Sequence, residues 1–112
     1  MILEAGTRGI ELYVARDGKT PFLEWLHALR DIRARARIRV RIDRVRLGNF
    51  GDCRSVGEGV FELRIGYGPG YRVYFAQVGG KVVLLLCGGD KGTQDRDIQR
   101  AKSYWRDYQE RP

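Results

Sequence analysis

The chain has 112 residues, with 21 Lys and Arg against 14 Asp and Glu, so its formal net charge is +7 at pH 7. Hydrophobic residues make up 43% of it, enough for a folded core and too many for a disordered chain. The longest apolar run, Val82 to Cys87, is far shorter than the roughly 20 residues that cross a bilayer. The first nine residues lack the pattern of a secretory signal, and the two cysteines lie far apart. We therefore expect a cytoplasmic protein with reduced thiols and a single domain over residues 1–112.

Arginine supplies nearly all of the positive charge, with seventeen arginines against four lysines. A guanidinium group presents a planar fork of donors that matches phosphate oxygens, whereas a lysine acts as a point charge. This composition indicates a nucleic acid or another acidic partner. Arginines that only keep a surface solvated would give the same composition, so the charge alone leaves both interpretations open.

The amino-terminal part predicts one strand and one helix. Residues 10–14 alternate between apolar and polar side chains, which indicates a short half-buried strand. Asp17-Gly18 then predicts a turn, and Thr20-Pro21 predicts a helix with threonine at the N-cap and proline at the first position. The helical spacing of its apolar residues predicts that this helix buries Phe22, Trp25, Leu26 and Leu29.

The next segment, residues 30–48, fits two patterns. From Arg33 to Ile42 basic and apolar residues alternate strictly, as in a strand. Its alanines and arginines are strong helix formers, however, and no glycine or proline interrupts it before Gly48. We predict a helix that ends at Gly48-Asn49 and exposes most of its arginines. Two apolar rows fit it, one through Ile38, Ile42 and Val45 and the other through Leu29, Ile32, Ala36 and Val40.

The carboxy-terminal half predicts three strands and a last helix. We expect residues 48–59 to form a loop, because glycines recur through it. Residues 61–91 then indicate three strands joined by glycine turns at 66–70 and 79–80. A final helix capped by Thr93 would bury Ile98, Ala101, Trp105 and Tyr108. The predicted fold is an α+β domain with a small antiparallel sheet, two amino-terminal helices and one carboxy-terminal helix.

Basic side chains stand at one end of each of the three strands. Arg64 lies near the end of the first strand, Arg72 opens the second, and Lys91 follows the third. If Leu63 and Val73 face the helices, strand alternation places Arg64, Arg72 and Tyr74 together on the other, exposed face. Such a basic surface suits a phosphodiester and points to RNA. A solvated sheet face, on which the arginines pair with Glu62 and Asp90, fits the same pattern.

The most characteristic motifs lie in the same half. They are ELR at 62–64, GPGYRVYF at 68–75, and LLLCGGDKGTQDRDIQRA at 84–101 followed by a tryptophan. A Pro-Phe-x-x-Trp-Leu helix and an arginine-rich helix ending in Leu-Gly-Asn precede them. Over residues 10–108 the chain resembles the RelE/ParE toxin superfamily, and within it the phage-derived addiction-module killer proteins, which are HigB-like toxins.

This resemblance implies a toxin of a type II toxin–antitoxin module that cleaves mRNA in the ribosomal A site without a metal or other cofactor. It implies catalytic positions at Arg64, Arg72 and Lys91. Their neighbours in the sequence, Tyr67, Tyr71, Tyr74 and Asp90, are our candidates for substrate binding. The resemblance also implies a cognate antitoxin, expected to be a helix-turn-helix protein, besides the ribosome and mRNA as partners. The early-helix tyrosine of some relatives is Asp97 here, and the histidine pairs of other branches are absent.

The chemistry such a site supports is attack of a ribose 2′-hydroxyl on the adjacent phosphate. Arg64 and Arg72 would stabilise the charge that develops on the phosphate oxygens, and Lys91, Tyr74 or Asp90 would transfer protons. RNA bases could stack on Tyr67 or Tyr71. Two other functions stay open, a ParE-like inhibitor of DNA gyrase and an inactive relative that only binds RNA or an antitoxin. In each case we expect the antitoxin to neutralise the basic face.

Overall fold

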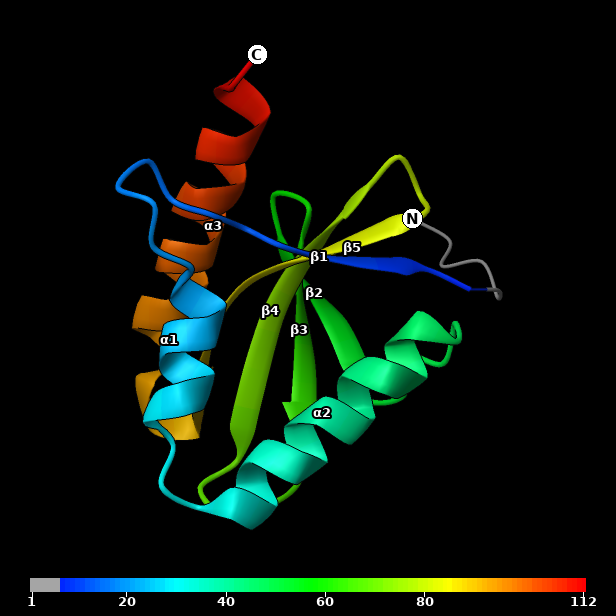
Figure 1. Cartoon of the computed structure of the whole chain (residues 1–112), viewed down its shortest axis with the longest axis vertical. Helices are drawn as coiled ribbons and strands as arrows, with labels where there is room; N and C mark the ends of the chain where they lie inside the picture. The colour runs from blue at the N-terminus through cyan, green and yellow to red at the C-terminus, as the bar shows by residue number, and fades with distance from the viewer. Residues whose placement is uncertain (1–6) are drawn as a thin grey trace.

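The computed structural model describes residues 7–112, in which three helices enclose a five-stranded sheet (Figure 1). The strand order across the sheet is β1-β5-β4-β3-β2. Strand β2 spans Cys53–Gly57, β3 Val60–Ile65, β4 Tyr71–Val78 and β5 Val82–Asp90. These four strands form an antiparallel meander, which confirms the predicted α+β fold and its three central strands. Residues 1–6 lie outside the described part, and they include most of the segment in which we expect no secretory signal.

The first strand departs from the expected antiparallel arrangement. Strand β1, Gly9–Leu12, pairs with β5 in parallel, because the chain crosses over through the rest of the domain before it returns as β5. The pairing ends when the backbone N–H of Tyr13 donates to the Leu85 carbonyl at 3.0 Å. Residues 86–90 of β5 therefore have a strand neighbour, β4, on one side alone.

Helices α1 and α2 cover one face of the sheet (Figure 1). Helix α1, Pro21–Ala28, begins with proline at the first position, as predicted, and packs its Phe22 and Leu26 into the core. Helix α2, Ile32–Arg46, confirms the helical interpretation of the arginine-rich segment. Its start is set by Asp31, whose side chain accepts hydrogen bonds from the backbone N–H groups of Arg33 and Ala34. The buried side of α2 carries Ala34, Ile38, Ile42 and Val45.

Helix α3, Gln94–Glu110, covers the opposite face of the sheet (Figure 1). A short 3-10 turn, Lys91–Thr93, leads into it from the end of β5. The predicted stripe is confirmed: Ala101 is fully buried, and the other three members pack around the second core cluster, namely Ile98, Trp105 and Tyr108. Within residues 7–112 no helix is both long and apolar enough to cross a membrane.

The expectation that residues 48–59 form a loop is wrong in its second half. Strand β2 occupies Cys53–Gly57 and pairs with β3 at the edge of the sheet. The glycines that suggested a loop instead build the turn into β3, where Gly57, Glu58 and Gly59 all have positive φ angles. Because β2 is an edge strand that is largely exposed, its sequence carries little of the apolar alternation that identifies buried strands.

A β-bulge in β5 controls what its last residues face. Tyr74 pairs with Cys87 and Phe75 with Leu85, so Leu86 is an extra residue. The alternation of side chains between the two faces of β5 shifts by one residue there. A Cβ atom on Gly88 would meet the Trp25 ring at 2.1 Å, and one on Gly89 would meet the Asp97 carboxylate at 1.8 Å. These two glycines let α1 and α3 approach opposite faces of the same strand. The start of α3 is thereby brought against the face that carries Arg72.

Candidate active site

A buried carboxylate organises the basic end of the sheet. Glu62, in β3, is fully inaccessible to solvent. Its Oε1 accepts hydrogen bonds from Nε of Arg54 and Nε of Arg64, both at 3.1 Å. Its Oε2 accepts from the Tyr74 hydroxyl at 3.1 Å and from Nε2 of Gln94 at 2.8 Å. Side chains from β2, β3, β4 and α3 therefore converge on one acid.

Strand register explains why these residues meet. Arg54 lies directly opposite Glu62 in the β2–β3 ladder, and Tyr74 lies opposite it in the β3–β4 ladder. Arg64 pairs in the same way with Arg72. Directly opposed residues project from the same face of a sheet, and residues two apart on one strand do the same. The prediction that Arg64 and Arg72 share a face is confirmed.

Three guanidinium groups surround this one carboxylate, so the cluster carries an excess of positive charge. Nε of Arg72 lies 3.9 Å from Glu62 Oε1, beyond hydrogen-bonding distance. This Nε is buried and has no hydrogen-bond partner among residues 7–112. The side chains become more exposed outward, from 12% for Arg72 to 33% for Arg64 and 51% for Arg54. An anion at this surface would meet donors that Glu62 orients but does not saturate.

The surroundings of Glu62 keep it ionised. Burial alone would raise the pKa of its carboxyl group, but hydrogen bonds from Gln94, Arg64, Tyr74 and Arg54 outweigh that effect and lower the pKa. The pKa of Tyr74 is strongly raised, first by burial and then by the charge of Glu62. The phenol therefore stays protonated and acts as a donor to the carboxylate near neutral pH.

Lys91 and Asp90 lie where β5 passes into α3. Lys91 is exposed and begins a shallow pocket of about 360 Å³ lined by residues 91–96. Gly89, which precedes it by two residues, pairs with Arg72, so Lys91 follows the basic cluster at the same end of the sheet. Asp90 caps the 3-10 turn, with its carboxylate accepting from the Gly92 N–H at 2.8 Å. That bond engages a carboxylate that we expected to serve substrate or proton transfer.

Two of the three candidate tyrosines do not present rings to solvent. Tyr74 is fully buried beneath α3, so the expectation that it lies on an exposed face is wrong. The reason is that α3 covers this face of β4, and the uncovered part is limited to the end where the arginines lie. Tyr71 points to the opposite face and packs edge-on against Trp25, with ring centroids 6.1 Å apart. In this conformation neither ring can stack on an RNA base.

Tyr67, in the turn between β3 and β4, is partly exposed but belongs to the α2 side. Its hydroxyl donates to Asp31 at 3.0 Å, and the guanidinium of Arg37 lies 4.6 Å from the centre of its ring. The cation already covers one face of this ring. Tyr67 and Tyr71 thus lie on the face of the sheet opposite Tyr74, while Arg64 and Arg72 are brought together as expected.

Three members of the cluster were missed as site residues. The sequence places Arg54 in the predicted 48–59 loop, presents Glu62 as a pairing partner of the arginines, and gives no sign of a role for Gln94. The alternation of Glu62 and Arg64 already placed both on one face, so a buried acid among arginines could have been suspected from it. Arg54 and Gln94 become neighbours through the β2 register and the position of α3, which no local pattern reveals.

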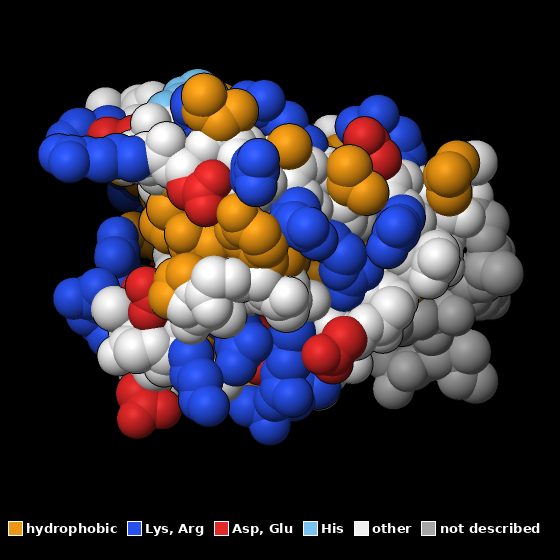
Figure 2. Space-filling view, turned by 90° about the horizontal axis from the view of Figure 1, so that it is seen from below, with side chains coloured by type: hydrophobic (Ala, Val, Ile, Leu, Met, Phe, Trp, Pro, Cys, Tyr) orange, Lys and Arg blue, Asp and Glu red, His pale blue; other side chains and the backbone are white. Residues whose placement is uncertain are grey.

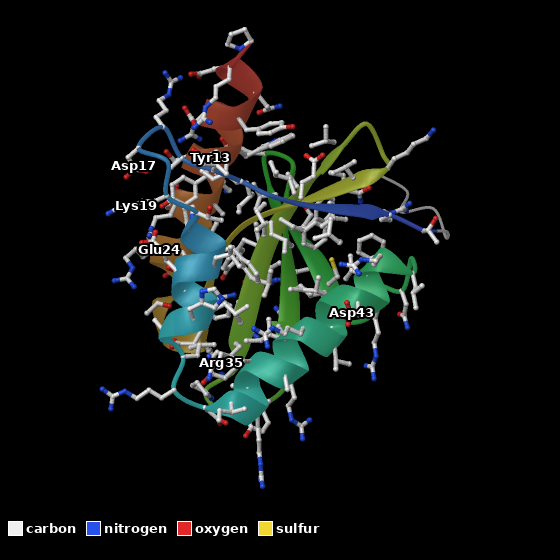
Figure 3. The ribbon with its side chains drawn as sticks, viewed as in Figure 1. Tyr13, Asp17, Lys19, Glu24, Arg35 and Asp43 are labelled. Atoms are coloured by element: carbon white, nitrogen blue, oxygen red, sulfur yellow. The ribbon has the colours of Figure 1, made fainter. Side chains whose placement is uncertain are left out.

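A larger cavity, of about 610 Å³, lies between α1, α3 and the end of β5. Figure 3 shows Asp17, Lys19 and Glu24 at this side, before and within α1. Three basic residues line the cavity, Lys19, Arg96 and Arg100, against the four acids Asp17, Glu24, Asp90 and Asp97. This balance does not favour a polyanion. Within residues 7–112 no three His, Cys, Asp or Glu side chains gather in a way that could hold a metal ion.

Two comparisons with known proteins find relatives of this chain. A protein of Haemophilus influenzae, described as uncharacterized, is 57% identical over 81 residues, which cover 72% of this chain and 82% of the relative. The family described as phage-derived protein, Gp49-like, matches residues 24–106, a range that contains Glu62, Arg64, Arg72, Lys91 and Gln94. The chain therefore belongs to the Gp49-like family of phage-derived proteins.

Proposed function

We propose that this protein is the toxin of a type II toxin–antitoxin module and that it cleaves mRNA on the ribosome. Membership in the Gp49-like family, which is associated with such modules, supports this assignment. The finer assignment to the RelE/ParE superfamily, and to its HigB-like toxins, rests on the motifs around Arg72 and Lys91. The proposed activity is that of a metal-independent endoribonuclease that acts in the cytoplasm.

The observation that carries the proposal is the arginine cluster around Glu62. Arg54, Arg64 and Arg72 approach one carboxylate, which leaves two positive charges without an acidic partner at the cluster. The buried acid fixes the direction of the Arg54 and Arg64 guanidinium groups before substrate arrives, and Arg72 lies beside it with its Nε free to donate. Donors that are already oriented stabilise developing charge without a cost of reorganisation in the transition state.

The reaction that this cluster suits is transfer of a phosphodiester to the neighbouring 2′-hydroxyl. The 2′-oxygen forms a bond to phosphorus as the bond to the 5′-oxygen breaks, which leaves a 2′,3′-cyclic phosphate and a 5′-hydroxyl end. Negative charge grows on the non-bridging oxygens, which would lie against Arg72 and Arg64.

The reaction also needs a group that takes the proton of the 2′-hydroxyl and one that supplies a proton to the leaving oxygen. Glu62 is a poor choice, because it is inaccessible to solvent and both of its oxygens already accept hydrogen bonds. Asp90 is engaged as a cap. We assign Lys91, which is exposed at the same end of the sheet, as the acid that protonates the leaving 5′-oxygen, while a water molecule takes the proton of the 2′-hydroxyl. Glu62 has a positioning role.

The proposed partners are the ribosome, mRNA and a cognate antitoxin of the helix-turn-helix type. The antitoxin would silence the toxin by neutralising the arginine cluster, with an acidic segment or an inserted helix. A single-stranded message is the proposed substrate, since its backbone can reach a shallow basic surface without base-specific readout.

Mapping of mRNA 5′ ends after brief induction of the chain tests the proposal. We expect new ends within translated regions, absent in an Arg72→Ala variant and present in an Arg106→Ala variant, because Arg106 is exposed on α3 and pairs with Glu58. Intact mRNA with arrested growth and altered DNA supercoiling would instead assign the chain to the gyrase inhibitors. Intact mRNA with normal growth would leave a binding protein.

A further inference from the structure

Helix α2 carries a second apolar row that the fold leaves uncovered. One turn of an α-helix takes 3.6 residues, so residues spaced by four and then seven fall on one line. Ile32, Ala36 and Val40 of α2, and Leu47 at its C-cap, have this spacing and form what we call the α2 strip. Ile32 is 72% exposed, Val40 48% and Leu47 70%. The strip lies opposite the side of α2 that packs on the sheet.

Arginines border the α2 strip on both sides. Arg33, Arg37 and Arg44 run along one side, and Arg35, Arg39 and Arg46 run along the other, with similar spacings. Over its length α2 has seven arginines and one acid, Asp43, which lies 3.7 Å from Arg46. Figure 3 labels Asp43 and one of the arginines, Arg35. In the part of the chain that the structure describes, no other arginine of α2 forms an ion pair with an acid.

A groove beside the α2 strip is already formed. It has a volume of about 360 Å³ and runs between α2 and the end of β3. Ala36 and Val40 of the strip, together with Ile65 and Tyr67, give it an apolar lining, while the guanidinium of Arg37 lies over the Tyr67 ring. Figure 2 shows apolar side chains on the face seen from below, gathered between groups of Lys and Arg. A partner side chain could enter here without a rearrangement.

The chemistry of this surface selects among possible occupants. A nucleic acid would use the arginines but gain little from exposed aliphatic side chains between them, because its backbone is charged and aliphatic groups do not stack on bases as rings do. A second copy of the chain would bring two rows of arginines against two more, which is repulsive. An amphipathic helix with an apolar stripe and acidic flanks matches both the strip and its borders.

We propose that α2 is a docking surface for an acidic amphipathic helix of a partner protein, which lays its apolar stripe along Ile32, Ala36, Val40 and Leu47. Acidic side chains of the partner pair with the bordering arginines, as e and g positions do in a coiled coil. This surface lies across the sheet from the Glu62 cluster, so the proposal does not depend on nuclease activity.

The test uses the full chain and a designed helical peptide of about 21 residues with leucine at positions a and d and glutamate at e and g. Like charges keep such a peptide from pairing with itself. We expect it to bind in fluorescence anisotropy, with a dissociation constant that rises with salt, and a version with lysine at e and g not to bind.

Two matched variants separate apolar docking from general attraction of acid to base. The Ile32→Ser/Val40→Ser double variant removes exposed side chains, and circular dichroism checks that it stays folded. It should bind the glutamate peptide about tenfold more weakly or worse, whereas Val14→Ser, at a residue 44% exposed outside α2, should bind it normally. If the double variant bound the glutamate peptide as tightly as the wild-type chain does, the proposal would be overturned. Self-association of the wild-type chain that the double variant abolishes would also overturn it, because the strip would then bind a second copy. RNA that displaces the peptide and binds the double variant equally well would overturn it too. Retained mRNA cleavage by the double variant separates this test from that of the nuclease.

Discussion

Replacing Glu62 by glutamine removes one negative charge from the centre of three guanidinium groups while nearly preserving the volume of the side chain. The carboxylate is fully buried and accepts four hydrogen bonds of 2.8–3.1 Å. The amide can still accept hydrogen bonds at its oxygen, but its NH₂ group faces donors wherever it is placed. The variant therefore leaves positive charge uncompensated and at least one donor poorly matched.

The magnitude follows from how far each arginine can recover its hydration. Removing one partner of a fully buried ion pair costs about 3–5 kcal/mol. Arg54 and Arg64 are 51% and 33% exposed, so water can compensate much of their loss, whereas Arg72 is 12% exposed and cannot turn to solvent as easily. We expect Glu62→Gln to lower the free energy of unfolding by about 2–4 kcal/mol, or the melting temperature by about 8–16 °C.

Urea unfolding at pH 7 measures this loss, with Glu58→Gln as the control. Glu58 also meets two cations, Lys102 and Arg106, but its side chain is 56% exposed, so we expect a loss below about 1 kcal/mol. Folding lowers the pKa of Glu62, so its ionised carboxylate stabilises the folded state. This stabilisation is fully present above pH 4.5, the ordinary pKa, and is lost as the pH falls through the pKa of the folded state. The difference between wild type and Glu62→Gln should shrink in acid. A Glu62→Gln protein as stable as wild type at pH 7 would refute the buried cluster.

Three further predictions concern packing, titration and salt. Gly88→Ala places a methyl carbon 2.1 Å from the Trp25 ring and should cost about 1–3 kcal/mol in urea unfolding, while Gly66→Ala, with nothing within 4 Å, should stay within about 0.5 kcal/mol of wild type. Equal losses would contradict the packing at Gly88. Burial, and then the hydrogen bond and charge of Asp107, raise the pKa of Tyr13 to about 12. Asp107→Asn should therefore shift the ultraviolet titration of this tyrosine to lower pH, and an unchanged titration would count against the contact. The logarithm of the affinity for single-stranded RNA should fall by about 0.7 for each tenfold increase in salt concentration and each neutralised phosphate. Arg72→Ala should make this salt dependence shallower by about that amount, and an identical slope would argue against a phosphate contact.

Much of the fold was predictable because its signals are local. The helical spacing of Phe22 and Leu26, and the period-two pattern on either side of the 66–70 turn, each lie within a few residues. Strand β2 was missed because an exposed edge strand has little apolar alternation. The parallel partner of β1 could not be read from the chain either, since it is chosen by residues about 70 positions away.

The site was predictable in part. Alternation correctly placed Arg64 and Arg72 on one face, but it could not show that α3 covers Tyr74 or that the shift at Leu86 turns Gly89 toward α3. Glu62 appeared as one more charged residue in the sequence. Its burial depends on four elements closing around it, which is a tertiary effect.

The most direct test of the account is the single-turnover rate at which purified chain cuts mRNA bound to programmed ribosomes, compared with Arg72→Ala. We expect products ending in a 2′,3′-cyclic phosphate and a rate about 10²–10³-fold lower in the variant, as for loss of one transition-state donor. Cleavage at the wild-type rate by Arg72→Ala, or no cleavage by the wild-type chain, would contradict it.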